Sequence, residues 1–164
     1  MNLSVAVSEN WGIGNENKLL FRIPDDLQRF KELTTGKVVV MGRNTYESLP
    51  ASRRPLPNRV NIVLSRNTAL DLPGVIICHS INALRVQLEN YSPRDVFIIG
   101  GGELYTQMLD YCETAYITKV QAAPSADCFF PDMEQQHDWR LVSETEPSIY
   151  NGTAYTYCIY TKAP

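Results

Sequence analysis

The sequence predicts an α/β fold with a central, mostly parallel sheet, and three features of the chain indicate it. Short apolar segments rich in β-branched residues alternate with helical patterns through the first two thirds of the chain. In the last third, apolar and polar residues alternate, which is typical of antiparallel strands with one exposed face. With 164 residues and 44% apolar content, the chain is long enough to bury one core. We expect residues 1–164 to form a single domain.

The predicted elements follow one another in this order. Short apolar runs bounded by turn residues predict strands that are buried on both faces, at residues 3–8, 37–42, 59–65, 74–78 and 95–100. Between and after these strands, helical patterns predict four helices, at residues 24–34, 43–49, 80–90 and 102–110. The alternating segments predict antiparallel strands that close one edge of the sheet, at residues 114–120, 138–147 and 153–162, with a turn at Asn151-Gly152.

Composition and charge exclude several classes of function. The net charge of −3 disfavours a nucleic-acid partner, because phosphate binding usually needs an excess of Lys and Arg. The chain shows neither a signal sequence nor an apolar run near the roughly 18 residues of a membrane span. We therefore expect a soluble, cytoplasmic protein. Neither a disulfide framework nor a metal site is expected, because the four cysteines lie far apart without a CxxC pair and the chain has only two histidines. These are Cys78, Cys112, Cys128, Cys158, His79 and His137.

The segment RIPDDLQRFKEL contains the candidate acid. Pro24 suits the first position of a helix, and acids in the first turn are favoured by the helix dipole, so a structural role explains both Asp25 and Asp26. Helical spacing separates the two, because Asp26 shares a face with Arg29, Phe30 and Leu33. An acid among apolar neighbours is a candidate catalytic group. Burial would raise its pKa and the helix dipole would lower it, so the sequence leaves the direction open.

Two glycine turns resemble each other in their setting. Gly100, Gly101 and Gly102 lie between a predicted buried strand and a helix, where free backbone N–H groups can face a phosphate. Tight packing of the strand against the helix explains these glycines equally well. Gly42 likewise ends a strand, and the following Arg43, Asn44 and Thr45 begin a helix. Two such turns at the carboxyl ends of strands indicate one extended ligand.

Three arginines are candidates for binding anions. Arg43 and Arg66 each follow a predicted strand and together suit the 2′-phosphate of a dinucleotide. Arg59 follows a proline-stiffened segment and suits a substrate carboxylate. Each arginine taken alone is also explained as an ordinary surface residue.

These motifs, in this order, resemble bacterial dihydrofolate reductases over nearly the whole chain. The matching segments are AVSENWGIG, PDDLQRFK, VVMGRNTYESL, RPLPNRVNIVLS, IIGGGELY and DCFFPD. The resemblance implies an eight-stranded, mostly parallel sheet with an antiparallel C-terminal strand and four flanking helices. It also implies NADPH-dependent reduction of 7,8-dihydrofolate to 5,6,7,8-tetrahydrofolate, with hydride to C6 and a proton to N5, in support of one-carbon metabolism. Antifolate inhibitors are implied as further ligands.

The resemblance also implies roles for residues of the substrate site. Asp26 would bind the pterin amidine and promote protonation of N5. Thr118 would hydrogen-bond Asp26 and reach the pterin 2-amino group through water. Arg59 would bind the glutamate α-carboxylate. The apolar walls of the pocket would be Val5, Ala6, Leu27, Phe30, Leu49, Leu56 and Ile99.

For NADPH, the resemblance implies a second set of residues. Those near the nicotinamide would be Ala6, Ile13 and Gly14, and those near the phosphates and ring would be Gly42, Arg43, Asn44, Thr45, Leu64, Ser65, Arg66, Gly100, Gly101, Gly102, Glu103, Leu104 and Tyr105. A cis Gly100–Gly101 bond is implied, as is a mobile loop at residues 9–23 that closes over the nicotinamide.

Two departures from the family pattern stand out. Phe21 occupies the position of a usual tryptophan in the catalytic region and has no N–H for the water near Asp26. Ser4 occupies the position of a usual bulky aliphatic residue, although strand alternation would give Ser4 and Val5 opposite faces. Two alternatives remain open: a reductase of the same fold acting on a pyrimidine or riboflavin precursor, and a nucleotide-binding module without catalysis. A monomer is expected.

Overall fold

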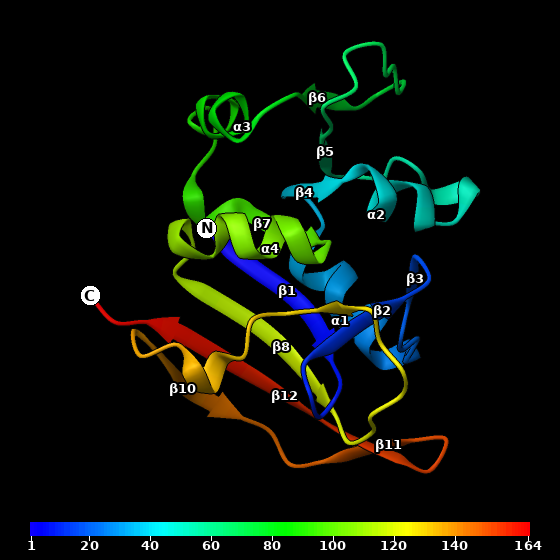
Figure 1. The fold of residues 1–164 in the computed structure, drawn as a ribbon, viewed down its shortest axis with the longest axis vertical. Helices are drawn as coiled ribbons and strands as arrows, with labels where there is room; N and C mark the ends of the chain where they lie inside the picture. The colour runs from blue at the N-terminus through cyan, green and yellow to red at the C-terminus, as the bar shows by residue number, and fades with distance from the viewer.

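The computed structural model describes residues 1–164, and the protein is built around one central sheet (Figure 1). Eight strands follow the order β10-β12-β8-β1-β7-β4-β5-β6, and β11 pairs with β12 as a ninth strand. Their bounds are β1 Asn2–Val7, β4 Val38–Gly42, β5 Val60–Leu64, β6 Ile76–Cys78, β7 Val96–Gly100, β8 Thr114–Val120, β10 Trp139–Glu144, β11 Ser148–Tyr150 and β12 Thr153–Lys162.

The strand directions confirm the predicted mixed sheet. β1 runs parallel to β7 and β8, and the parallel pairing continues from β7 through β4 and β5 to β6. β12 is antiparallel to β8, and both β10 and β11 are antiparallel to β12. β8 therefore differs from the expectation for an all-antiparallel C-terminal third, because it is parallel to β1 on one side and antiparallel to β12 on the other.

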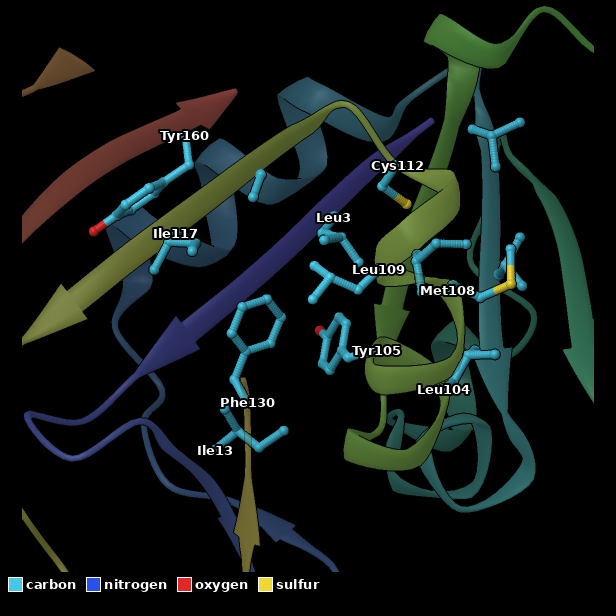
Figure 2. Close-up of a cluster of buried hydrophobic side chains, with 14 of the residues drawn as sticks. Leu3, Ile13, Leu104, Tyr105, Met108, Leu109, Cys112, Ile117, Phe130 and Tyr160 are labelled. Carbon is cyan, nitrogen blue, oxygen red and sulfur yellow. The ribbon is translucent and has the colours of Figure 1, made fainter. Parts of the chain in front are cut away.

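Four helices cover the two faces of the sheet. They are α1 Pro24–Thr34, α2 Arg43–Ser48, α3 Ile81–Leu88 and α4 Gly102–Met108, close to the predicted ranges. The larger core cluster lies under α3 and α4 and includes the α4 side chains Leu104 and Tyr105, and Figure 2 shows Tyr105 facing Phe130. The smaller cluster contains Tyr46 of α2 and packs against Phe30 and Leu33 of α1. Alternating residues of β4 enter the two clusters, as expected for a strand buried on both faces.

The structure adds details that the sequence patterns did not predict. The loop expected at residues 9–23 contains β2 Gly12–Asn15 and β3 Lys18–Leu19, which form a three-stranded sheet with β9 Cys128–Phe129. Glu16 and Asn17 make the β2–β3 turn with positive φ angles of 51° and 62°. The strand expected at 138–147 ends at Glu144, and the chain passes Pro147 before β11 begins. Proline cannot donate the hydrogen bond of a continuing strand.

Parallel pairing fixes where a ligand site can form. The ends of β4, β5 and β7 lie at one edge of the sheet, since Met41 pairs with Gly100 and Gly42 pairs with Leu64. The loops that follow these strands therefore converge, as is usual for ligand sites in open α/β sheets. None of the helices is long and apolar enough to cross a membrane.

Candidate active site

A cleft of about 810 Å³ opens at this edge of the sheet. One side, which we call the acidic arm, is lined by α1 and the residues around it, including Asp26, Leu27, Arg29, Phe30 and Leu49. The other side, which we call the glycine arm, consists of Gly42–Thr45, Leu64–Arg66 and Gly100–Tyr105. β1 lies between them and contributes Val5 and Ala6. The cleft therefore joins the candidate acid to both glycine turns.

The structure separates the two acids of the first helical turn. Asp25 is exposed, whereas Asp26 is half-buried and accepts a hydrogen bond of 2.5 Å from the Thr118 hydroxyl of β8. Burial raises the pKa of Asp26, while the Thr118 hydrogen bond and the positive charge of Arg29 oppose this rise. Desolvation therefore outweighs the groups that favour the carboxylate. The direction of the shift, open from sequence alone, is upward.

Arg29 lies one turn after Asp26 and also lines the cleft. Its guanidinium carbon is 4.2 Å from the centre of the Tyr157 ring and 6.0 Å from that of Tyr116. Tyr157 lies on β12 directly opposite Thr118 of β8. The adjacent strands β8 and β12 thus each contact one cleft-lining side chain of α1, Asp26 and Arg29 respectively.

The Gly100–Gly102 turn requires glycine at two positions. Gly100 has a φ of +129°, and a Cβ there would lie 3.3 Å from the Thr45 hydroxyl. A Cβ on Gly102 would lie 2.7 Å from the Cys128 sulfur, so α4 could not approach β9 as closely. The Gly100–Gly101 bond is cis. Tight packing of α4 against β9 thus explains Gly102. Gly100 and Gly101, which have no side chains, leave their backbone exposed along the cleft.

Tyr105 fixes the glycine turn against β1. Its ring is buried, its hydroxyl donates to the Ser4 carbonyl at 2.7 Å, and it packs edge-on against Phe130 (Figure 2). Burial raises the pKa of Tyr105 above its ordinary range, so the phenol remains a neutral donor. This contact anchors α4 to the strand in the middle of the cleft.

Cationic and polar groups surround the outer part of the glycine arm. Arg43 pairs with Glu47 one turn later, at 2.8 Å between Nε and Oε1, and Arg66 is exposed at the end of β5. His79 also lines the cleft, with its Nδ1 atom 2.7 Å from the Ser65 carbonyl. The two guanidinium groups remain accessible from the cleft.

Most residues expected at the site line the cleft. Every residue expected to bind the cofactor does so, and so do Phe21, Val5, Ala6, Leu27, Phe30, Leu49 and Ile99. Ser4 also lines it, together with its β1 neighbours Val5 and Ala6.

Three expected residues lie outside the cleft lining. Leu56 is buried in the smaller core cluster, where Asn61 hydrogen-bonds both its N–H and its carbonyl. Arg59, which directly precedes β5, lies beside the C-terminal end of α1 and donates to the Thr34 hydroxyl at 3.0 Å. Thr118 is buried behind Asp26 and contacts it from β8.

Other cleft residues were not singled out from the sequence. Arg29 was placed on the face of Asp26 by helical spacing, yet nothing local indicated that Tyr157 would hold it. The β2–β3 hairpin contributes Lys18 and Leu19, whose position depends on pairing with β9 more than a hundred residues later. His79 follows β6, and its place at the end of a parallel strand was the available signal.

A desolvated carboxyl group that shares one cleft with bare glycine turns and two arginines defines a nucleotide-dependent enzyme of the α/β class. Comparison with known proteins identifies the family. Residues 1–162 match the sequence model described as "Dihydrofolate reductase". The dihydrofolate reductase of Staphylococcus aureus is 40% identical over 151 residues, which cover 91% of this chain and 89% of that protein.

Two further relatives agree. The bifunctional dihydrofolate reductase-thymidylate synthase of Glycine max is 34% identical over 96% of this chain, which spans only 33% of that longer protein. A structure of dihydrofolate reductase from Enterococcus faecalis complexed with NADP(H) and RAB-propyl superposes with a TM-score of 0.86 at 30% identity, covering 99% of this chain and 96% of that one. The chain belongs to the dihydrofolate reductase family.

Proposed function

We propose that the chain reduces 7,8-dihydrofolate to 5,6,7,8-tetrahydrofolate with NADPH, in support of one-carbon metabolism. The observation that carries this proposal is the position of Asp26, a carboxyl group in the acidic arm of the same cleft that holds both glycine turns. Family membership agrees with it.

Asp26 orients the substrate and assists the transfer of a proton to N5. Its Oδ1 atom accepts the Thr118 hydrogen bond, which leaves Oδ2 to accept N–H groups from the amidine edge of the pterin. The proton reaches N5 through water. Phe21 has no N–H or O–H with which to donate a hydrogen bond to that water.

Apolar side chains hold the ring and exclude water. Val5, Phe30 and Ile99 line the cleft around Asp26, and Leu27 remains 44% exposed although it lies in the middle of this apolar lining. An exposed leucine in a cleft is a ready contact for a flat aromatic ligand. We place the aminobenzoyl group here, with its glutamate extending toward Arg59 at the end of α1.

The glycine arm fits NADPH by the chemistry of its groups. Gly42 and Gly101 leave backbone exposed without a Cβ, and the guanidinium groups of Arg43 and Arg66 match phosphate oxygens. Arg43 and Arg66 would hold the 2′-phosphate, while Ile13 and Gly14 would border the nicotinamide. When bound there, NADPH supplies the hydride.

We further propose a cytoplasmic monomer without nucleic-acid or membrane partners. One chain supplies the whole cleft, all four cysteines are free thiols, and the net charge is −3. Leu141, Val142 and Ile149 are exposed on β10 and β11, away from the cleft. Sedimentation at increasing protein concentration tests the monomer, because pairing through these strands would appear as a dimer.

The absorbance of NADPH tests the activity. Oxidation should be rapid when dihydrofolate is present and absent without it, and NADH should be a poorer donor because it lacks the 2′-phosphate. A reductase of a pyrimidine or riboflavin precursor would instead oxidise NADPH only with such a substrate. A binding module would bind NADPH and oxidise none.

A further inference from the structure

We infer that Arg29 is a positioning residue of the reaction: seated on Tyr157, it directs a fixed positive charge at Asp26 that favours the ionised carboxylate and leaves its Oδ2 atom free for the substrate. This inference rests on the proposed function of Asp26. It concerns a side chain that holds the acid in its working state without itself binding the substrate.

The geometry consists of two contacts between one helix and two strands. Asp26 and Arg29 are three residues apart on α1 and therefore share a face. Thr118 on β8 contacts Asp26, and Tyr157 on β12 contacts Arg29, with Thr118 and Tyr157 directly paired across the strands. The separation between acid and guanidinium is thus fixed by the docking of α1 on the sheet.

A direct ion pair would serve the reaction less well. A guanidinium commonly takes both oxygens of a carboxylate, which would remove the acceptors that the pterin needs. Arg29 takes part in none of the ion pairs in the structure and instead lies over the face of Tyr157. A cation on an aromatic face keeps its charge in a partly desolvated setting. Its field therefore acts on Asp26 through space.

The groups facing Asp26 make Arg29 the one charge that can act in this way. β8 contributes the neutral hydroxyl of Thr118, and β12 contributes Tyr157. Burial, together with the charge of Asp26, raises the pKa of Tyr157 to about 12, so Tyr157 stays neutral. On α1 itself, Arg29 is the charge that lowers the pKa of Asp26 against the larger effect of burial.

The test is a ¹³C NMR titration of the Asp26 carboxyl group in the ligand-free protein. Arg29→Met should raise its titration midpoint by about half to one pH unit, and Arg29→Lys should restore most of the difference. Lys31→Met is the matched control, because it removes an exposed positive charge from the same helix outside the cleft and should leave the midpoint unchanged.

Kinetics supply the second readout. In Arg29→Met, the acid limb of the pH profile of kcat/KM for dihydrofolate should move to higher pH. The KM for dihydrofolate should rise by a larger factor than the factor by which kcat changes. Should Arg29→Met fail to fold, Arg29→Gln serves the same test. An unchanged midpoint in a folded neutral variant overturns the inference. Because the titration uses protein without ligand, its result is independent of whether Asp26 proves necessary for dihydrofolate reduction.

Discussion

The two arms of the cleft are built differently. The glycine arm is local: each of its turns follows a single strand, and parallel pairing of β4, β5 and β7 brings the turns together. The acidic arm is assembled over long distances, since Asp26 and Thr118 are 92 residues apart and Tyr157 comes from the last strand. The first arm presents backbone and exposed cations, and the second presents one desolvated carboxyl group. Binding of the nucleotide and chemistry on the substrate can therefore be altered separately.

The largest expected effect lies in the acidic arm. Asp26→Asn removes the group that binds the amidine edge and assists the proton, so kcat/KM for dihydrofolate should fall about 10²- to 10³-fold at neutral pH. The loss should be milder at low pH, where solvent protonates the substrate directly. NADPH absorbance measures both. NADPH affinity should be retained, and an unaffected rate of reduction would refute the role.

The glycine arm should respond to loss of cations in a complementary way. Arg66→Gln removes a charged contact to the 2′-phosphate, so the KM for NADPH should rise about tenfold while that for NADH changes little. Steady-state kinetics with both cofactors measure the ratio. Equal losses with NADPH and NADH would contradict the assignment. Arg94→Gln, an exposed arginine outside the cleft, is the matched control.

A smaller effect is expected at the contact between α1 and β8. Thr118→Val keeps the shape of the side chain but removes the hydrogen bond that favours the Asp26 carboxylate. kcat/KM for dihydrofolate should fall about fivefold, equivalent to about 1 kcal/mol. The pKa of Asp26 should rise further. Thr118→Ser, which retains the hydroxyl, should preserve the wild-type pH profile, and its failure to do so would point to packing instead.

The smallest effect concerns stability. The native pKa of Asp26 lies above its ordinary value of 3.8, so the folded protein keeps this proton to higher pH than the unfolded chain. The free energy of unfolding therefore falls as pH rises from the pKa of Asp26 in the unfolded chain to its higher pKa in the folded protein. Asp26→Asn should be more stable than wild type at neutral pH by on the order of 1 kcal/mol, measured by urea unfolding. The difference should shrink as pH falls below the native pKa; a constant difference would exclude titration as its cause.

The contrast between the arms also explains how far the sequence could be interpreted. The strands, the four helices and the glycine turns were predictable, because hydrophobic periodicity and glycine placement are local signals. Helical spacing likewise placed Asp26 and Arg29 on one face. Family resemblance supplied the contact with Thr118, which no local pattern indicates.

The remainder depends on tertiary contacts that single segments do not encode. The pairing of Tyr157 with Thr118 follows from the register of β12 on β8. The β2–β3–β9 sheet joins distant segments, so the loop at residues 9–23 showed no clear strand pattern. Leu56 was expected in the pocket, and its apolar character alone could not distinguish a cleft wall from the core that buries it.

Transfer of deuterium tests most directly whether the two arms serve one reaction. NADPH with deuterium in place of both hydrogens on the reactive carbon of its nicotinamide should give tetrahydrofolate labelled at C6, detected by mass spectrometry and NMR of the product. Wild type should show full transfer with no loss to water. Product without the label, or labelled at another carbon, would contradict a direct transfer across the cleft between the glycine arm and the acidic arm.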